Sequence, residues 1–185
     1  ALGDLAVLFR TKEADFKAAQ QAYLLACPQR TQWYAQQLAA LEAPKGMAEQ
    51  MPSPKLKVGL MWGSNPAAVN ANFMRWSQQR SVLVQLFERL AVLLPEVQFV
   101  SLQNAERGAE AALAPKLDIF DLSHLQTDFL ETASLIANLD LVISVDTSVS
   151  HLAGAMGKET WVPLIYRSDW RHGNKRASSY WYAHT

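Results

Sequence analysis

From residue 56 onward, short apolar runs alternate with segments of helical spacing. Helical spacing of apolar residues is clear at 81–96 and 127–139, and a further helix, 147–157, ends at Gly157, a favoured residue after a helix. The apolar runs predict five short strands, at residues 56–62, 97–103, 117–123, 140–145 and 160–166. These strands are apolar on both faces and lack hairpin turn signals. The pattern therefore predicts an α/β fold, a Rossmann-like parallel sheet with helices on both faces.

The first 55 residues have a different character. Residues 13–42 are rich in Ala, Gln and Leu and predict helix, interrupted at Pro28. Residues 43–55 carry three prolines and a glycine, which is typical of a linker. We therefore expect a helical N-terminal segment with a Pro-rich linker over 1–55, followed by the Rossmann-like domain over 56–185.

Composition excludes several classes. Lys plus Arg and Asp plus Glu are both 17, so the basic bias of a nucleic-acid binder is missing. The single cysteine, Cys27, allows no internal disulfide and fits a reducing, cytoplasmic setting. No apolar stretch reaches the roughly 18 residues of a membrane span. The sequence also lacks a GxGxxG loop, a P-loop and a GxSxG elbow.

Polar residues cluster where the predicted strands end. The stretches are "MWGSNP", "SLQN", "DLSH", "VDTS" and "YRSDWR". Parallel strands bring their carboxyl ends to one edge of a sheet, where ligands of such folds bind. These stretches supply hydroxyls, amides, indoles and a guanidinium, groups that bind sugars and phosphates.

The stretch "SVDTSVSHLAGAMGK", residues 144–158, allows two interpretations. A helix that starts at Thr147 offers backbone N–H groups and a partial positive charge to a diphosphate, and Ser148 and His151 are within reach of the same anion. In this interpretation Asp146 accepts hydrogen bonds from sugar hydroxyls. Alternatively, Asp146 or Thr147 only caps the helix, and His151 is a satisfied, partly buried histidine.

The segment "LDLVISVDTSVSHLAGAMGK" resembles the donor-site motif of the heptosyltransferase-like glycosyltransferases of family 9. The resemblance covers roughly residues 56–182 and is closest to bacterial members that are joined to tetratricopeptide repeats. It implies the C-terminal, donor-binding half of a GT-B fold, which transfers a sugar from a nucleoside-diphosphate sugar. Departures from the family pattern are Glu159, Ser168 and His172.

The resemblance also implies a set of donor contacts. Diphosphate and sugar would contact the helix start, Gln103 would face the nucleotide, and Ser64 and Asn65 would lie near the phosphates or the acceptor. Arg80 would neutralise phosphate, and the closing segment would add Asp169, Trp170 and Arg171. The implied donor contacts are Asp146, Thr147, Ser148, His151, Gln103, Ser64, Asn65, Arg80, Asp169, Trp170 and Arg171.

Each of these positions also has a structural interpretation. In this structural interpretation, Asp169 to Arg171 form a surface loop. Trp62 and Phe129 are either stacking groups at the ligand or core residues. Asp128, with Glu131 three residues on, predicts a helix cap. Arg75 is expected in a solvated loop.

We expect neither a cofactor nor a metal, because His124, His172 and His184 lack metal-ligand spacing and no Asp-x-Asp occurs. No catalytic base is identified. The rival functions are a binding module that is inactive alone and a decayed interaction domain. Self-association or a separate N-terminal acceptor domain would complete the cleft, and the acceptor is unknown.

Overall fold

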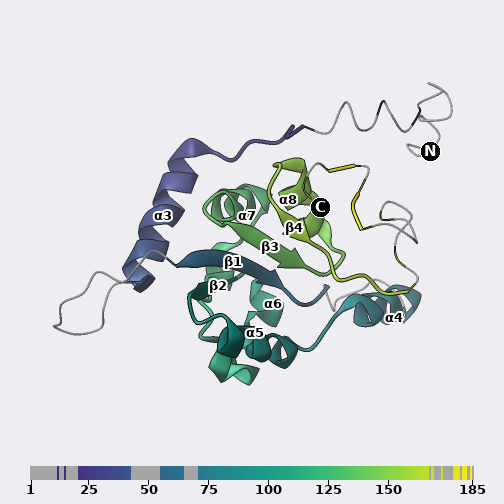
Figure 1. Ribbon diagram of the computed structural model, residues 1–185, viewed down its shortest axis with the longest axis horizontal. Coiled ribbons are helices and arrows are strands. Elements are labelled where there is room, and N and C mark those ends of the chain that lie inside the picture. Colours follow the sequence, from purple (N-terminus) through teal and green to yellow (C-terminus); the bar gives the residue numbers. More distant parts are fainter. Residues whose placement is uncertain are drawn as a thin grey trace.

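The computed structural model describes most of the chain from residue 21 onward. The described residues are 12, 15, 21–42, 55–64, 71–166, 168, 172, 177–179, 181, 182 and 184. Helices and strands carry the labels of Figure 1.

A parallel sheet lies at the centre of the molecule (Figure 1). Its strands are β1 (Leu56–Met61), β2 (Val97–Ser101), β3 (Leu141–Ser144) and β4 (Thr160–Trp161), in the order β2-β1-β3-β4. β1 pairs with β2 on one side and with β3 on the other, so the chain reverses its direction of travel across the sheet at β1. In a doubly wound sheet, such a reversal opens a ligand crevice at the carboxyl ends of the two strands concerned. The predicted fold class is confirmed.

Two of the five predicted strands are shorter than expected. Residues 117–123 contribute a single parallel bridge, Val100 with Phe120, at the outer edge of β2. The positive φ of Asp118 (46°) and the turn that begins at Ser123 leave too little extended chain for a strand. β4 stops at Trp161, and Pro163, which has no N–H to donate, follows it closely.

One face of the sheet is covered by η2 (Val84–Phe87), α5 (Glu88–Leu93), η3 (Ala109–Leu113) and η4 (Pro115–Leu117). The predicted helix 81–96 is thus a 3-10 turn that continues as a short α-helix. Val58, Leu60 and Trp62 alternate along β1 and its extension and point into this layer. Of the apolar residues that predicted the helix, Phe87 is buried, whereas Leu83, Leu86, Val92 and Leu93 are exposed.

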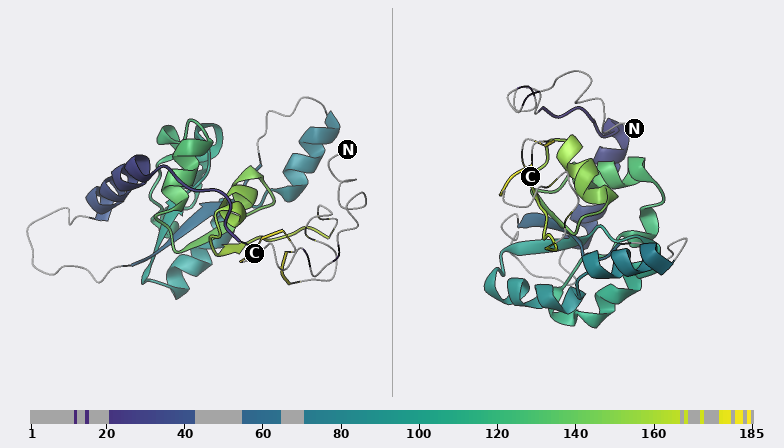
Figure 2. Two further views of the ribbon diagram at one scale, coloured as in Figure 1. Left: turned by 90° about the horizontal axis from the view of Figure 1, so that it is seen from above. Right: turned by 90° about the vertical axis from the view of Figure 1, so that its right-hand side faces the viewer.

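The opposite face is covered by α7 (Phe129–Ile136), α8 (Ser148–Ala155) and α3 (Pro28–Glu42), as Figure 2 shows from two sides. Tyr34 and Leu38 of α3 are completely or almost completely buried in the same cluster as Leu135 and Val142. α3 packs on α7, where Arg30 forms an ion pair with Glu131. The apolar stripe of α3 therefore closes the core of the sheet domain.

Asp15 is helical, as predicted, but the predicted helix 13–42 is interrupted over a longer stretch than Pro28 alone. Residues 21–27 are not helical, and the N–H groups of Tyr23 and Leu24 donate to the Ala155 carbonyl at the end of α8. Pro28 is the first residue of α3, a position where its missing N–H costs nothing. Most of the remaining predicted helix and linker residues lie outside the described part.

The remaining helices are α4 (Ala71–Arg80), which hydrophobic spacing did not predict, α6 (Ala105–Gly108) and η5 (Ser123–Leu125). In α4, the apolar residues Phe73, Met74 and Trp76 lie in the first six positions and the last four residues are polar, so apolar spacing continues for less than two turns. Within the described part of the chain, no helix is long and apolar enough to cross a bilayer.

Candidate functional site

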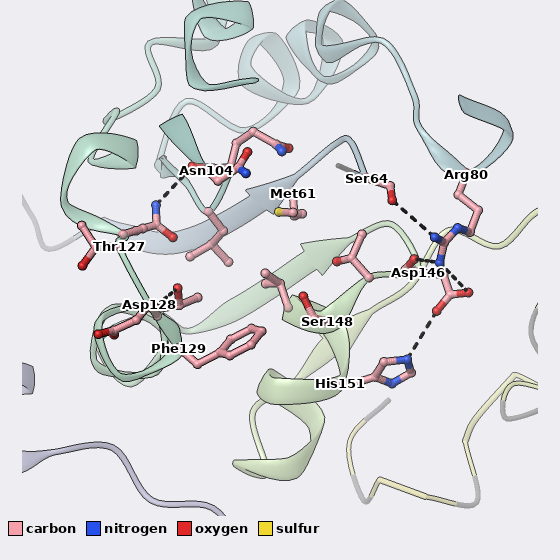
Figure 3. A pocket seen from close by; sticks show the side chains of 16 residues that line it. Met61, Ser64, Arg80, Asn104, Thr127, Asp128, Phe129, Asp146, Ser148 and His151 are labelled. Carbon is pink, nitrogen blue, oxygen red and sulfur yellow. Dashed lines mark hydrogen bonds and ion pairs between the residues drawn. The ribbon is translucent and has the colours of Figure 1, made fainter. Parts of the chain in front are cut away.

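A pocket of about 620 Å³ opens at the carboxyl ends of β1, β2 and β3 (Figure 3). The chain reversal at β1 places it in the crevice that the topology predicts. Its volume is in the range of cofactor and ligand sites. The residues that line it are Met61, Ser64, Arg80, Leu102, Gln103, Asn104, Gln126, Thr127, Asp128, Phe129, Thr132, Asp146, Thr147, Ser148, Val149 and His151.

The start of α8 forms one end of this pocket. Thr147 is the N-cap residue, and Ser150 completes the cap: its hydroxyl accepts from the Thr147 N–H (3.3 Å) and donates to the Thr147 carbonyl (2.7 Å). The interpretation in which Thr147 caps the helix is confirmed. Asp146 is not the cap residue, so its carboxylate serves another purpose. Ser148 is exposed at the pocket and His151 lies one turn further on.

The carboxylate of Asp146 is the centre of a buried polar cluster. Oδ1 lies 3.2 Å from Nε2 of His172 and 3.6 Å from Nε2 of His151, and Oδ2 lies 3.7 Å from Nη1 of Arg80. Burial by itself would raise the pKa of Asp146. The hydrogen bond to His172 and the charges of His172, Arg80 and His151 act in the opposite direction and together hold this pKa below its ordinary value. Asp146 is therefore an ionised carboxylate.

Arg80, the last residue of α4, joins the first and fourth polar stretches. Nη1 donates to the Asp146 carbonyl (2.6 Å) and Nη2 donates to the hydroxyl of Ser64 (3.3 Å). The guanidinium is largely buried and lines the pocket with Ser64 and Asp146, as the sticks in Figure 3 show. A fixed positive charge thus lies at the same end as the N-terminus of α8.

Two further side chains, Gln103 and Arg107, fix the loop after β1 through hydrogen bonds to its backbone. The amide of Gln103 accepts from the Gly63 N–H (3.1 Å) and donates to the Gly63 carbonyl (3.0 Å). Arg107 donates to the Ser64 carbonyl (3.0 Å). The Arg107 guanidinium lies so close to Gly63 that no larger residue fits there without displacing it. The position of Ser64 is therefore set by its backbone contacts.

The opposite end of the pocket, beyond β2, is built differently. Gln126 donates to the Ser101 carbonyl (3.0 Å), but its own Oε1 and the Oδ1 of Asn104 are buried without a hydrogen-bond partner among the described residues. Phe129 is 60% exposed, so the expectation that it is a core residue is wrong. Asp128 caps α7 by accepting from the Glu131 N–H (2.9 Å), which confirms that prediction. Glu131 itself binds Arg30.

Most of the predicted site residues that the structure describes come together. Asp146, Thr147, Ser148, His151, Gln103, Ser64 and Arg80 all line the pocket. Trp62 is fully buried in the core, where its indole donates to Glu110 (2.8 Å), so the core interpretation is confirmed. Arg75 is exposed as expected, but it lies in α4 and not in a loop. Asn65, Asp169, Trp170 and Arg171 lie outside the described residues.

Sequence reasoning did not identify two residues of the cluster. His172 contacts Asp146, and the hydroxyl of Tyr182 lies 3.0 Å from Nδ1 of His151. Both come from the C-terminal segment, 26 and 31 positions from their partners. No local spacing signals such contacts, because they depend on the path of the chain after β4.

Residues 86–162 match the family model described as glycosyltransferase family 9 (heptosyltransferase). The fold is similar to that of the E. coli ADP-heptose LPS heptosyltransferase II, with a TM-score of 0.52 and 16% sequence identity. The match covers 75% of this chain and 38% of that chain, so this chain spans well under half of that protein's length. A search of curated proteins finds no match. The resemblance to the heptosyltransferase-like family is confirmed.

Proposed function

We propose that this heptosyltransferase-like chain is the donor-binding half of a glycosyltransferase. It has a Rossmann-like sheet and a pocket where the chain reverses its direction across that sheet. Its ligand is a nucleoside-diphosphate sugar. The observation that carries the proposal is the convergence of Ser64, Arg80 and His151 on the N-terminus of α8, at the carboxyl ends of β1 and β3.

The α8 end of the pocket suits the diphosphate. A helix N-terminus presents backbone N–H groups and a partial positive charge, and Ser148 adds an exposed hydroxyl beside it. The buried guanidinium of Arg80 adds a full positive charge. Its hydrogen bonds go to a carbonyl and a hydroxyl, and its charge is shared with the Asp146 carboxylate at 3.7 Å. The neighbouring carboxylate, Asp146, favours sugar hydroxyls over phosphate oxygens as partners.

The β2 end suits the nucleoside. Asn104 and Gln126 present carbonyl oxygens that need donors, and Phe129 presents an exposed ring. Bases and riboses supply N–H and O–H donors, and a base stacks on an aromatic face. Gln103 acts between the two ends, since its amide holds Gly63 in place.

The reaction we propose is sugar transfer. The bond between the anomeric carbon and the diphosphate oxygen breaks, and a bond from that carbon to an acceptor oxygen forms. The leaving diphosphate gains negative charge, which the α8 N-terminus and Arg80 stabilise. We assign neither the acceptor nor the base that takes the acceptor's proton to this chain.

A second candidate is a binding module that holds the donor without turning it over. The match covers only 38% of the heptosyltransferase II chain, so donor binding and sugar transfer are tested separately. In that case an acceptor-binding half, from a separate domain or another copy of this chain, completes the cleft.

Calorimetric titration with ADP, GDP, UDP, CDP and TDP in the presence of EDTA tests the proposal. We expect selective binding of one nucleotide, weakened at least tenfold in His151→Ala and unchanged in His124→Ala, whose side chain is exposed outside the pocket. Binding by none of the five, with a folded chain, contradicts donor binding. Binding without release of sugar from the matching donor sugar, with or without acceptors, identifies the inactive module.

A further inference from the structure

We propose that Asp146, His151 and His172 form a binding site for a divalent transition-metal ion, of which Zn²⁺ is the best fit. The site is distinct in composition from the donor contacts, because His172 comes from the C-terminal segment and does not line the main pocket. The proposal concerns the chain without nucleotide, so it does not rest on the proposed function.

The distances between the three ligand atoms fit a small metal ion. Both histidines direct Nε2 toward the same carboxylate oxygen, Oδ1 of Asp146, at 3.2 and 3.6 Å. The three ligand atoms lie within 4.8 Å of one another. In a tetrahedral zinc site with bonds of about 2.0–2.1 Å, neighbouring ligand atoms are about 3.3 Å apart. Zn²⁺ therefore requires only small side-chain shifts.

The donor set also fits. Two imidazoles and one carboxylate are a common set for zinc sites that keep a fourth position open. His172 and Asp146 are at least nine-tenths buried, with side chains 4% and 8% exposed, whereas His151 is 27% exposed. His151 and Asp146 also line the main pocket, which places the open position toward that pocket. The carboxylate is ionised, as metal binding requires.

A neighbouring residue orients one of the ligands. The Tyr182 hydroxyl lies 3.0 Å from Nδ1 of His151. When the Tyr182 hydroxyl accepts a hydrogen bond from the Nδ1–H of His151, Nε2 carries the lone pair that faces Asp146 and His172. Gly154 makes this possible, because a Cβ there would lie 2.5 Å from the Tyr182 ring. Such an outer hydrogen bond is typical of histidines that bind metals.

Arg80 limits the affinity. Its Nη1 lies 3.7 Å from Oδ2, the other oxygen of the same carboxylate. Metal and guanidinium thus share Asp146 through different oxygens, and their repulsion weakens binding. The competing explanation is a metal-free triad, in which His172 donates to Asp146 and anchors the C-terminal segment. The two explanations differ in what a metal titration shows.

The test is titration of the nucleotide-free chain with Co²⁺ as a spectroscopic substitute and with Zn²⁺ in competition. We expect one equivalent of Co²⁺ with the strong visible absorption of a four-coordinate site, displaced by Zn²⁺ and removed by EDTA. His172→Gln retains an amide donor for Asp146 and should lower the affinity at least tenfold. Tyr182→Phe should lower it about tenfold.

Two matched controls sharpen the result. His124→Gln removes an exposed histidine, and Cys27→Ser removes the single thiol, and neither should change the spectrum. Circular dichroism establishes that each variant is folded, and His151→Gln replaces His172→Gln if the latter unfolds. Absence of a four-coordinate spectrum, or a spectrum that survives both histidine substitutions in folded protein, overturns the metal site. Nucleotide binding measured in EDTA is unaffected by either outcome.

Discussion

The two ends of the pocket differ in how their buried polar side chains are hydrogen-bonded. At the α8 end, Asp146, Arg80 and the histidines contact one another and are fixed before any ligand arrives. At the β2 end, the side-chain carbonyl oxygens of Asn104 and Gln126 are buried without partners among the described residues, and Phe129 is exposed. One end is satisfied internally, and the other requires an external donor.

This difference separates stability from binding. A satisfied buried cluster stabilises the fold, and removing one member leaves the others without partners. An unsatisfied buried acceptor costs free energy in the ligand-free protein, and binding recovers it. We therefore expect substitutions at the α8 end to lower stability and substitutions at the β2 end to lower affinity alone.

The largest effect should come from Asp146→Ala. It removes the partner of Arg80 and His172, both largely buried, and should lower the free energy of unfolding by about 3 kcal/mol. Urea denaturation at neutral pH measures this. Glu96→Ala, which removes an exposed carboxylate, is the control and should cost well under 1 kcal/mol. Equal effects of the two substitutions would contradict the central role of Asp146.

Arg80→Ala should follow in magnitude. We expect nucleotide affinity to fall by about 1.5–3 kcal/mol, roughly 10- to 150-fold, because a charge-assisted contact to the diphosphate is lost. Calorimetry in EDTA measures it, and Arg89→Ala on the exposed side of α5 is the matched control. Unchanged affinity in a folded Arg80→Ala variant would place the diphosphate elsewhere.

The parallel sheet and the α8 end of the pocket were largely predictable from the sequence, whereas the order of the strands was not predicted. Apolar runs identify buried strands, and the polar residues after them, Ser64 and Asp146 among them, must meet at one sheet edge. His172 was unpredictable, because it lies 26 positions after Asp146, beyond α8 and β4, and the contact depends on the path of the chain after β4. The β2 end was unpredictable for another reason: whether the carbonyl oxygen of Asn104 or Gln126 finds a partner is a question of side-chain placement.

The same limit explains the errors in secondary structure. Residues 81–96 have helical spacing, yet this segment starts with the 3-10 turn η2. It buries Val84 and Phe87 instead of all the apolar residues that share the helical spacing. The apolar residues of α4 end at Trp76, which is too short a run to predict a helix from spacing. Both errors concern segments in which tertiary packing outweighs periodicity.

Asn104→Ala tests the β2 end. Its Oδ1 makes no hydrogen bond within the described part of the chain, so truncation should leave the free energy of unfolding within about 0.5 kcal/mol of the parent. Affinity for the preferred nucleotide should fall by about 1 kcal/mol, roughly fivefold. Urea denaturation and calorimetry on the same preparation separate the two quantities. A loss of stability without a loss of affinity would reverse the assignment of this end.

Phe129→Ala should have an effect on affinity similar to that of Asn104→Ala and is the most specific to the base. Phe129 and Leu130 are neighbours at the start of α7 and are both about half exposed, at 60% and 49%, but only Phe129 lines the pocket. Truncation of either should therefore change stability little and to a similar extent. Stacking on an aromatic ring is worth about 0.5–1.5 kcal/mol, so Phe129→Ala should weaken nucleotide binding about two- to tenfold while Leu130→Ala leaves it unchanged.

Titration with inorganic pyrophosphate separates the base from the diphosphate, because a ligand without a base should bind Phe129→Ala and the parent equally. If pyrophosphate binding falls as much as nucleotide binding, Phe129 supports the α8 end through the fold, and the two ends are not independent.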